Sequence, residues 1–186
     1  MINKKLLEPQ ISERKKVLFA TIYHYESIIN SLKELQNVEN LVLFVDREDE
    51  IQKNSFEVIE KVSNLSKIKI QKEKFDVCDF SQMFKKLDEI VKKFQDFDIY
   101  VDISHSVRIK AIALINYFSI RYPSNFKRMT FYASWIPEII EIPIFKAEKL
   151  NDIELKCIKY ISKNKIFMIN DLAKHLDCSQ THVYRV

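Results

Sequence analysis

The sequence contains no glycine, although average usage predicts roughly a dozen in a chain of 186 residues. This absence excludes the GxGxxG dinucleotide loop, the GxxxxGKS/T phosphate loop and the GxSxG nucleophile elbow, because each motif requires glycine at fixed positions. Tight turns have to use Asn, Asp, Ser or Pro, or a residue in a strained conformation, as in the segments 63–67 and 122–127.

Cysteine is also scarce. The three cysteines, Cys78, Cys157 and Cys178, are far apart, odd in number and outside any CxxC pair. This spacing predicts reduced thiols, with no disulfide framework and no zinc site. The histidines and acidic residues form no metal-ligand pattern either, so we expect no metal ion and no bound cofactor.

Long hydrophobic runs are absent. No apolar run reaches the roughly 18 residues needed to span a bilayer, and residues 1–16 lack the continuous apolar segment of a signal peptide. We therefore expect a cytoplasmic protein with no membrane partner. The net charge is +4, from 30 Lys and Arg against 26 Asp and Glu, which permits an anionic partner without requiring one.

The sequence does contain an alternation of β-type and α-type segments, and 47% of its residues are hydrophobic. Strands are predicted at 16–22, 40–46 and 97–103, which are short apolar runs, and at 67–73, which alternates like an edge strand. Each is followed by a predicted helix: the segments 24–38, 50–65 and 80–94 have helical spacing of apolar residues, and 106–122 is apolar on most of its circumference. This alternation predicts an α/β fold with a parallel sheet flanked by helices, and two closing strands at 127–134 and 138–145.

The last part of the chain changes to helix alone. A helix is predicted at 151–164, with Asn151 or Asp152 as its cap, and another at 168–177, with a cap at Asn170. The apolar set of the first of these helices is Ile153, Leu155, Ile158 and Ile161. A third helix begins with Ser179 as its cap, after a tight turn. This pattern is typical of a helix-turn-helix, which we expect to be incomplete because the chain ends seven residues after Ser179. The predicted domains are therefore 1–147 and 148–186, and the expected DNA-binding residues are Ser179, Gln180, Thr181, His182, Tyr184 and Arg185.

Two polar corners follow predicted strands: "TIYHYE" after the first and "DISHSVR" after the fourth. Ligands of open parallel sheets bind at the carboxyl ends of the strands, where the strand order reverses. If these two strands are neighbours, the corners lie together. The helix N–H groups, Arg108 and His105 could then hold an anion, with hydroxyl donors from Ser104 and Ser106. Aromatic rings of Tyr23, His24 and Tyr25 could stack on a base.

The same residues also have purely structural interpretations. Ser104 or Ser106 is a candidate for the N-cap of the following helix. Asp102 is placed to fix the turn, and His24 and His105 are of a type that is more often a hydrogen-bonded structural group than a catalyst.

The order of these parts resembles the CRISPR-associated Rossmann fold (CARF) family, and in particular the archaeal CARF transcription regulators with a C-terminal winged helix-turn-helix. The resemblance implies a Rossmann-like ligand-binding and dimerisation domain, a homodimer, double-stranded DNA as a partner, and cyclic oligoadenylate as an effector bound across the dimer axis. Carried over residue by residue, it implies that the ligand-binding residues are Thr21, Ile22, Tyr23, His24, Tyr25, Asp102, Ser104, His105, Ser106 and Arg108. Tyr23 and Ser106 replace glycines that are common in the family, which narrows the room for a phosphate-ribose backbone.

Three hypotheses follow. The first is a CRISPR-associated transcription regulator that responds to cyclic oligoadenylate, in which no residue is catalytic. The second is a ring nuclease that cleaves cyclic oligoadenylate with Ser104, His105 and Arg108. The third is a dimerisation and DNA-binding module without a small ligand.

Overall fold

The computed structural model of the chain describes residues 14–45, 49–74, 79–133, 135, 138–146, 151–164, 168–179 and 181. The chain forms two compact units, Met1–Lys146 and Ala147–Val186. Each unit is described by itself.

The first unit alternates strands and helices in the predicted order. Its elements are β1 (Lys16–Thr21), α1 (Tyr25–Leu35), β2 (Val38–Val45), α2 (Glu50–Leu65), β3 (Lys69–Lys74), α3 (Phe80–Lys93), β4 (Asp98–Asp102), α4 (Arg108–Arg121), β5 (Phe126–Phe131) and β6 (Ile140–Ile142).

The sheet has six strands in the order β3-β2-β1-β4-β5-β6. All neighbours pair in parallel except β5 and β6, which are antiparallel. The chain runs outward from β1 to β3, then returns to β4 on the other side of β1. The strand order therefore reverses between β1 and β4. The predicted Rossmann-like α/β fold with closing strands is confirmed.

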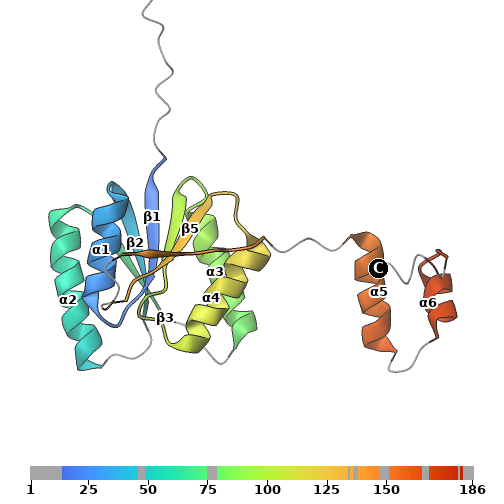
Figure 1. Cartoon of the computed structure of the whole chain (residues 1–186). Helices are drawn as coiled ribbons and strands as arrows, with labels where there is room; N and C mark the ends of the chain where they lie inside the picture. The colour runs from blue at the N-terminus through green and yellow to red at the C-terminus, as the bar shows by residue number, and fades with distance from the viewer. Residues whose placement is uncertain are drawn as a thin grey trace, which may run out of the picture. The chain divides into compact units, whose positions relative to one another are not determined.

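Helices cover both faces of the sheet, with α1 and α2 on one face and α3 and α4 on the other (Figure 1). Successive residues of β1 point to opposite faces. Leu18 and Ala20 pack with the α1 and α2 side, whereas Val17 and Phe19 pack with the α3 and α4 side. Burial on both faces explains why the central strands are apolar without interruption.

Helix α2 packs on the sheet with an unexpected stripe. The apolar spacing of the sequence predicts that Ile51 faces inward with Ile59, but Ile51 is exposed. The buried positions of α2 are instead Ile59 together with Gln52, Ser55 and Ser63. Polar side chains at the start of α2 therefore face the end of β1.

Within the described part of the chain, five residues have a positive φ, as expected for a chain without glycine. They are Gln36, Asn37, Lys67, Tyr122 and Asp177, with φ between 35° and 57°. Lys67 and Tyr122 lie in the two turn segments that the sequence singles out. Each of these residues carries a Cβ where glycine would cost less.

The second unit contains α5 (Asp152–Lys163) and α6 (Ile169–His175). Asn151 caps α5 in a capping box with Glu154, as predicted for this position. The predicted cap at Asn170 is wrong, because the N-cap of α6 is Met168, two residues earlier. Cys157 of α5 packs against Leu172 and Leu176.

Most residues of the predicted third helix lie outside the described part of the chain. Ser179 and Thr181 are described and are exposed, whereas Gln180, His182, Tyr184 and Arg185 are not described. Within the described residues, no helix combines the length and the apolar character that crossing a membrane requires.

Candidate functional site

The two polar corners meet at the carboxyl ends of β1 and β4. These strands are parallel neighbours, and Ala20 is paired with Asp102. The condition under which the two corners lie together is therefore met. The corners are also in contact, because the rings of His24 and His105 meet edge to face with their centroids 5.4 Å apart.

The first corner consists of two buried residues followed by three exposed aromatic side chains. Thr21 and Ile22 are buried, whereas Tyr23, His24 and Tyr25 are exposed. Tyr23 and His24 contact each other edge to face, at 4.9 Å between ring centroids. The exposed rings are the part of this corner that a ligand could reach.

Asp102 fixes the second corner from inside the protein. Its side chain is fully buried. One oxygen, Oδ1, accepts hydrogen bonds from the backbone N–H of Ser104 at 2.8 Å and from the Ser104 hydroxyl, and Oδ2 accepts one from the Ser31 hydroxyl at 2.8 Å. Burial raises the pKa of Asp102, and these hydrogen bonds oppose the rise. Asp102 thus links the corner to α1.

The two serines of the corner bind the backbone and do not cap α4. Ser104 Oγ accepts a hydrogen bond from the Tyr132 N–H at 2.8 Å, and Ser106 Oγ donates one to the Val107 carbonyl at 3.1 Å. Helix α4 begins at Arg108, two residues later than the sequence predicts, and its N-cap is Val107. The interpretation of Ser104 or Ser106 as the N-cap is therefore wrong.

Glycine is not required by the backbone at either family position. Tyr23 and Ser106 both lie outside the set of residues with positive φ. The hydroxyl of Ser106 is turned onto the neighbouring carbonyl. The extra atoms at these two positions therefore affect the room above the corner and leave the path of the chain unchanged.

His105 is half-buried between the two corners. Burial lowers its pKa, and the nearby His24 lowers it further, while Asp102 and Glu26 act in the opposite direction. Its ring is therefore neutral at pH 7. The Nε2 atom is buried and makes no hydrogen bond with any described residue.

The helices that begin at the two corners lack side-chain caps. The N-cap residues of α1 and α4, His24 and Val107, make no side-chain hydrogen bond to the first turns of their helices. The outer helices differ, since Asp49 caps α2 and Asp79 caps α3. Among these four helices, only α1 and α4, which follow the central strands β1 and β4, therefore keep free N–H groups and the positive end of the helix dipole available to a ligand.

Buried polar atoms without a partner gather at the same edge of the sheet. Three such atoms are Thr21 Oγ1 at the end of β1, Ser27 Oγ in the first turn of α1, and His105 Nε2. None of them makes a hydrogen bond with a described residue. Buried polar groups are usually satisfied, so a group of them beside uncapped helices favours a binding site.

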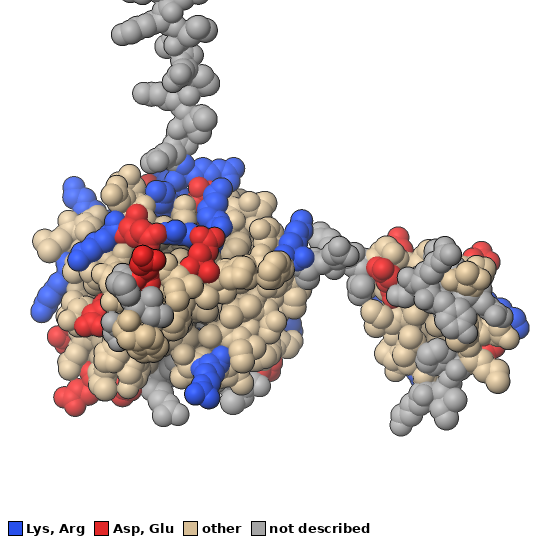
Figure 2. All heavy atoms as spheres, viewed as in Figure 1, with Lys and Arg blue, Asp and Glu red and all other residues tan. Residues whose placement is uncertain are grey.

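The opposite edge of the sheet has paired charges. Lys15 is 3.0 Å from Glu39, and Asp98 is 3.5 Å from Lys127. Figure 2 shows Lys and Arg mixed with Asp and Glu over the edge where β1 begins. The amino ends of the strands therefore carry charged side chains of both signs, some of them in ion pairs.

Sequence reasoning missed the residues that hold the first corner. Gln52 Nε2 of α2 donates to the carbonyl of Ile22 at 3.2 Å, and Ser55 Oγ donates to the carbonyl of Tyr23 at 3.0 Å. The only sequence signal is that these polar residues interrupt the apolar stripe of α2. The described residues include no group of three or more His, Cys, Asp or Glu side chains that could hold a metal ion.

The strand order and the two corners define a Rossmann-like domain whose polar corners lie at its topological switch point. The family described as "HFX_2341_N:-like, N-terminal" matches residues 18–118, which is more than half of the chain. The chain belongs to this family. No curated protein matches this chain.

Among solved structures, the chain is similar to Can2 from Sulfobacillus thermosulfidooxidans in complex with cyclic tetra-adenylate (cA4). The TM-score is 0.56 and the sequence identity is 14%. The match covers 79% of this chain and 40% of the Can2 chain, so this chain accounts for less than half of the length of that protein. The shared property is the fold, which is the CARF-like fold that the sequence predicts.

Proposed function

We propose that this protein is a CRISPR-associated transcription regulator that binds cyclic oligoadenylate at the two corners and DNA through its C-terminal unit. Support comes from the resemblance of both corners to the CARF ligand loops and from the fold shared with Can2, which was solved with cyclic tetra-adenylate.

One observation carries the ligand proposal: α1 and α4 begin without side-chain caps beside each other, on either side of the β1 and β4 ends. Two uncapped helix ends and the exposed guanidinium of Arg108 suit phosphate groups. The exposed rings of Tyr23, His24 and Tyr25 suit adenine bases. In this proposal Thr21, Ile22 and Asp102 shape the site from below.

The proposed dimer forms through α4. Ile109, Ile112 and Ile120 of this helix are exposed, and Ile112 keeps 53% of its surface accessible. Val107, at the corner, is exposed as well. A second copy that covers these side chains would bring its own corner next to the first, so that one ring contacts both chains.

The proposed DNA contacts are made by Ser179, Gln180, Thr181, His182, Tyr184 and Arg185. Because half-site spacing on DNA follows from dimer geometry, a ligand between two first units has direct influence on DNA affinity. Mobility-shift titrations of promoter DNA with and without the ligand test this part: equal affinities would remove the regulator role.

Calorimetry tests the ligand proposal. Cyclic tri-, tetra- and hexa-adenylate are titrated into the wild-type protein and into Arg108→Ala. We expect one of the three rings to bind and Arg108→Ala to weaken binding by about tenfold or more, as for loss of a hydrogen-bonded charge. If none of the rings binds, the ligand proposal is wrong and the module without a small ligand is favoured.

A ring nuclease is the second candidate. The unpartnered Nε2 of neutral His105 is suited to accept a proton from a ribose hydroxyl. The Ser104 hydroxyl, however, already donates to Asp102 and accepts from Tyr132, which favours a structural role for it. Chromatography after a long incubation separates the candidates: intact ligand means a binding protein, and linear products mean a nuclease.

A further inference from the structure

A pocket lies next to the first corner, between α2 and the carboxyl ends of β2 and β3. Its volume is about 410 Å³, and its lining is Ile22, Val45, Gln52, Lys53, Phe56, Glu57, Lys72, Glu73 and Lys74. A volume in this range is usual for small-molecule sites and leaves room for far more than a phosphate ion.

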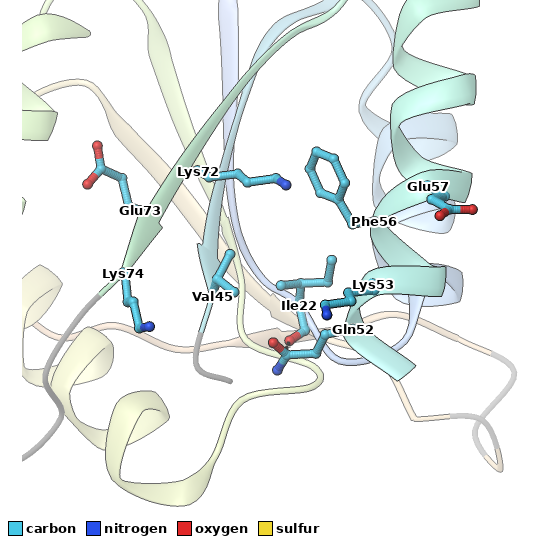
Figure 3. A pocket seen from close by; sticks show the side chains of 9 residues that line it. All are labelled: Ile22, Val45, Gln52, Lys53, Phe56, Glu57, Lys72, Glu73 and Lys74. Carbon is cyan, nitrogen blue, oxygen red and sulfur yellow. Dashed lines mark hydrogen bonds between the residues drawn. The ribbon is translucent and has the colours of Figure 1, made fainter. Parts of the chain in front are cut away.

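The ligand would have to be an anion. Figure 3 shows Lys53 and Lys72 pointing into the space between α2 and the sheet, while Glu57 points away from it and Glu73 points to the other side of β3. Glu73 is satisfied there by Lys86 at 2.8 Å. Among the described residues, Lys53 and Lys74 have no ion pair.

The ligand would also have to donate a hydrogen bond. Gln52 is 5% exposed and lines the pocket. Its Nε2 is used by the carbonyl of Ile22, but its Oε1 is buried without a partner among the described residues. A buried acceptor without a donor costs free energy, which a ligand N–H would recover.

The pocket has one aromatic surface. The Lys72 ammonium lies over the Phe56 ring, 3.1 Å from the ring centroid. A planar base that enters the pocket can replace this ammonium on the ring, which frees Lys72 to contact the anionic group of the same ligand. The helix end plays no part, because Asp49 already caps α2.

We propose that this pocket binds a nucleoside 5′-monophosphate whose base carries an amino group, such as AMP. The amino group donates to Gln52 Oε1, the base packs on Phe56, and the phosphate lies among Lys53, Lys72 and Lys74. The site shares Ile22 with the corner that the proposed function uses, but AMP binding there does not depend on that function. The two are neighbours, however, because Gln52 also holds the carbonyl of Ile22.

The test uses the full chain and calorimetric titration with AMP. Wild type should bind AMP saturably, and more tightly than adenosine or inorganic phosphate alone. Lys74→Glu should weaken binding by about tenfold or more, because it removes a charged partner of the phosphate. Lys92→Glu is the matched control, since this exposed lysine lies on α3 at the other face of the sheet and the charge change is the same.

Two further titrations define the contacts. N6,N6-dimethyl-AMP keeps the phosphate and the ring but loses both amino N–H groups, so it should bind at least about tenfold more weakly than AMP. Arg108→Ala should leave AMP binding unchanged.

Several results would overturn the proposal. They are no AMP binding, equal effects of Lys74→Glu and Lys92→Glu, equal binding of AMP and phosphate, equal binding of AMP and its dimethyl analogue, or loss of AMP binding in Arg108→Ala, which would move AMP to the corner. Binding of AMP without binding of any cyclic oligoadenylate would remove the proposed function and leave this site in place.

Discussion

At the scale of single residues, the absence of glycine leaves strain in the turns. Lys67 has φ of 57° at the end of α2, where the N–H of Ile68 bonds to the carbonyl of Ser63 at 2.8 Å. This is the position at which helices usually place glycine. The chain therefore carries a conformational cost at Lys67 that a residue without Cβ would avoid.

Lys67→Gly should stabilise the protein. The left-handed conformation costs a residue with a Cβ roughly 1–2 kcal/mol, and the greater freedom of glycine in the unfolded chain returns part of this. We expect a net gain of about 0.5–1 kcal/mol in the free energy of unfolding, measured by urea denaturation. Lys67→Ala is the control, since it removes the charge but keeps Cβ; an equal gain in both variants would show that charge, not backbone strain, is responsible.

His105 should couple nucleotide binding to pH. In the free protein, burial and the nearby His24 lower the pKa of His105 below its ordinary value of 6.5. As the pH falls below 6.5, the unfolded chain therefore binds more protons than the folded chain, and this histidine lowers the free energy of unfolding. A bound phosphate favours the imidazolium form and raises this pKa. Binding then takes up a proton, and affinity should rise as pH falls through this range.

We expect binding of the cyclic ring to tighten by up to about tenfold between pH 7.5 and pH 5.5, since one pKa unit corresponds to a factor of ten. The ionisable neighbours are His24, Asp102 and Glu26. Calorimetry in buffers of different ionisation enthalpy measures the proton uptake. His105→Gln should remove most of it; unchanged uptake in this variant would assign the proton to another group.

At the scale of elements, the four helices of the first unit divide into two kinds. Asp49 and Asp79 satisfy the first turns of α2 and α3, whereas α1 and α4 begin uncapped at the corner. A missing cap costs about 0.5–2 kcal/mol of stability. The central helices thus give up stability where the proposed ligand binds.

A new N-cap on α4 should stabilise the fold and weaken binding of the cyclic ring. Val107→Asp should raise the free energy of unfolding by about 1 kcal/mol, because its carboxylate can accept from the first turn of the helix. The same carboxylate would repel phosphate, so ring binding should fall by about tenfold or more. Val107→Thr supplies an uncharged cap for comparison. If Val107→Asp gains stability and binds the ring as well as wild type, the start of α4 is not part of the site.

The sequence was sufficient to predict the elements and their order, because most strands are apolar runs, β3 alternates, and most helices have clear apolar spacing. It placed the two corners together only on the condition that β1 and β4 are neighbours, which the sheet order of the structure meets. It did not predict that Gln52 and Ser55 hold the first corner or that Ser31 binds Asp102. These contacts join residues 30 to 71 positions apart and depend on how each helix is rotated against the sheet.

The apolar set predicted for α5 is only partly buried, for a related reason. Ile153 packs beside Cys157 and Tyr160 against α6, as predicted. The other three members, Leu155, Ile158 and Ile161, are exposed. A short helix with apolar residues on two faces does not define which face is buried. Only the position of the partner helix decides it.

At the scale of the whole molecule, the proposed ligand site depends on a dimer. One chain supplies two uncapped helix ends, His105 and Arg108, whereas a cyclic ligand would present its phosphates around a ring. The exposed isoleucines of α4 lie on the same helix as Arg108. Association through α4 would therefore bury apolar surface and complete the site in one step.

Native mass spectrometry of the protein with cyclic tetra-adenylate tests this claim most directly. For the wild-type protein we expect a species of two chains with one ring. Ile112→Glu should give single chains without ligand. Arg108→Ala should give dimers without ligand. The matched control for the dimer is Leu65→Glu, which adds the same charge to an apolar residue that is exposed at the end of α2. One ring bound to each single chain, or two-chain species that never carry a ring, would contradict the account.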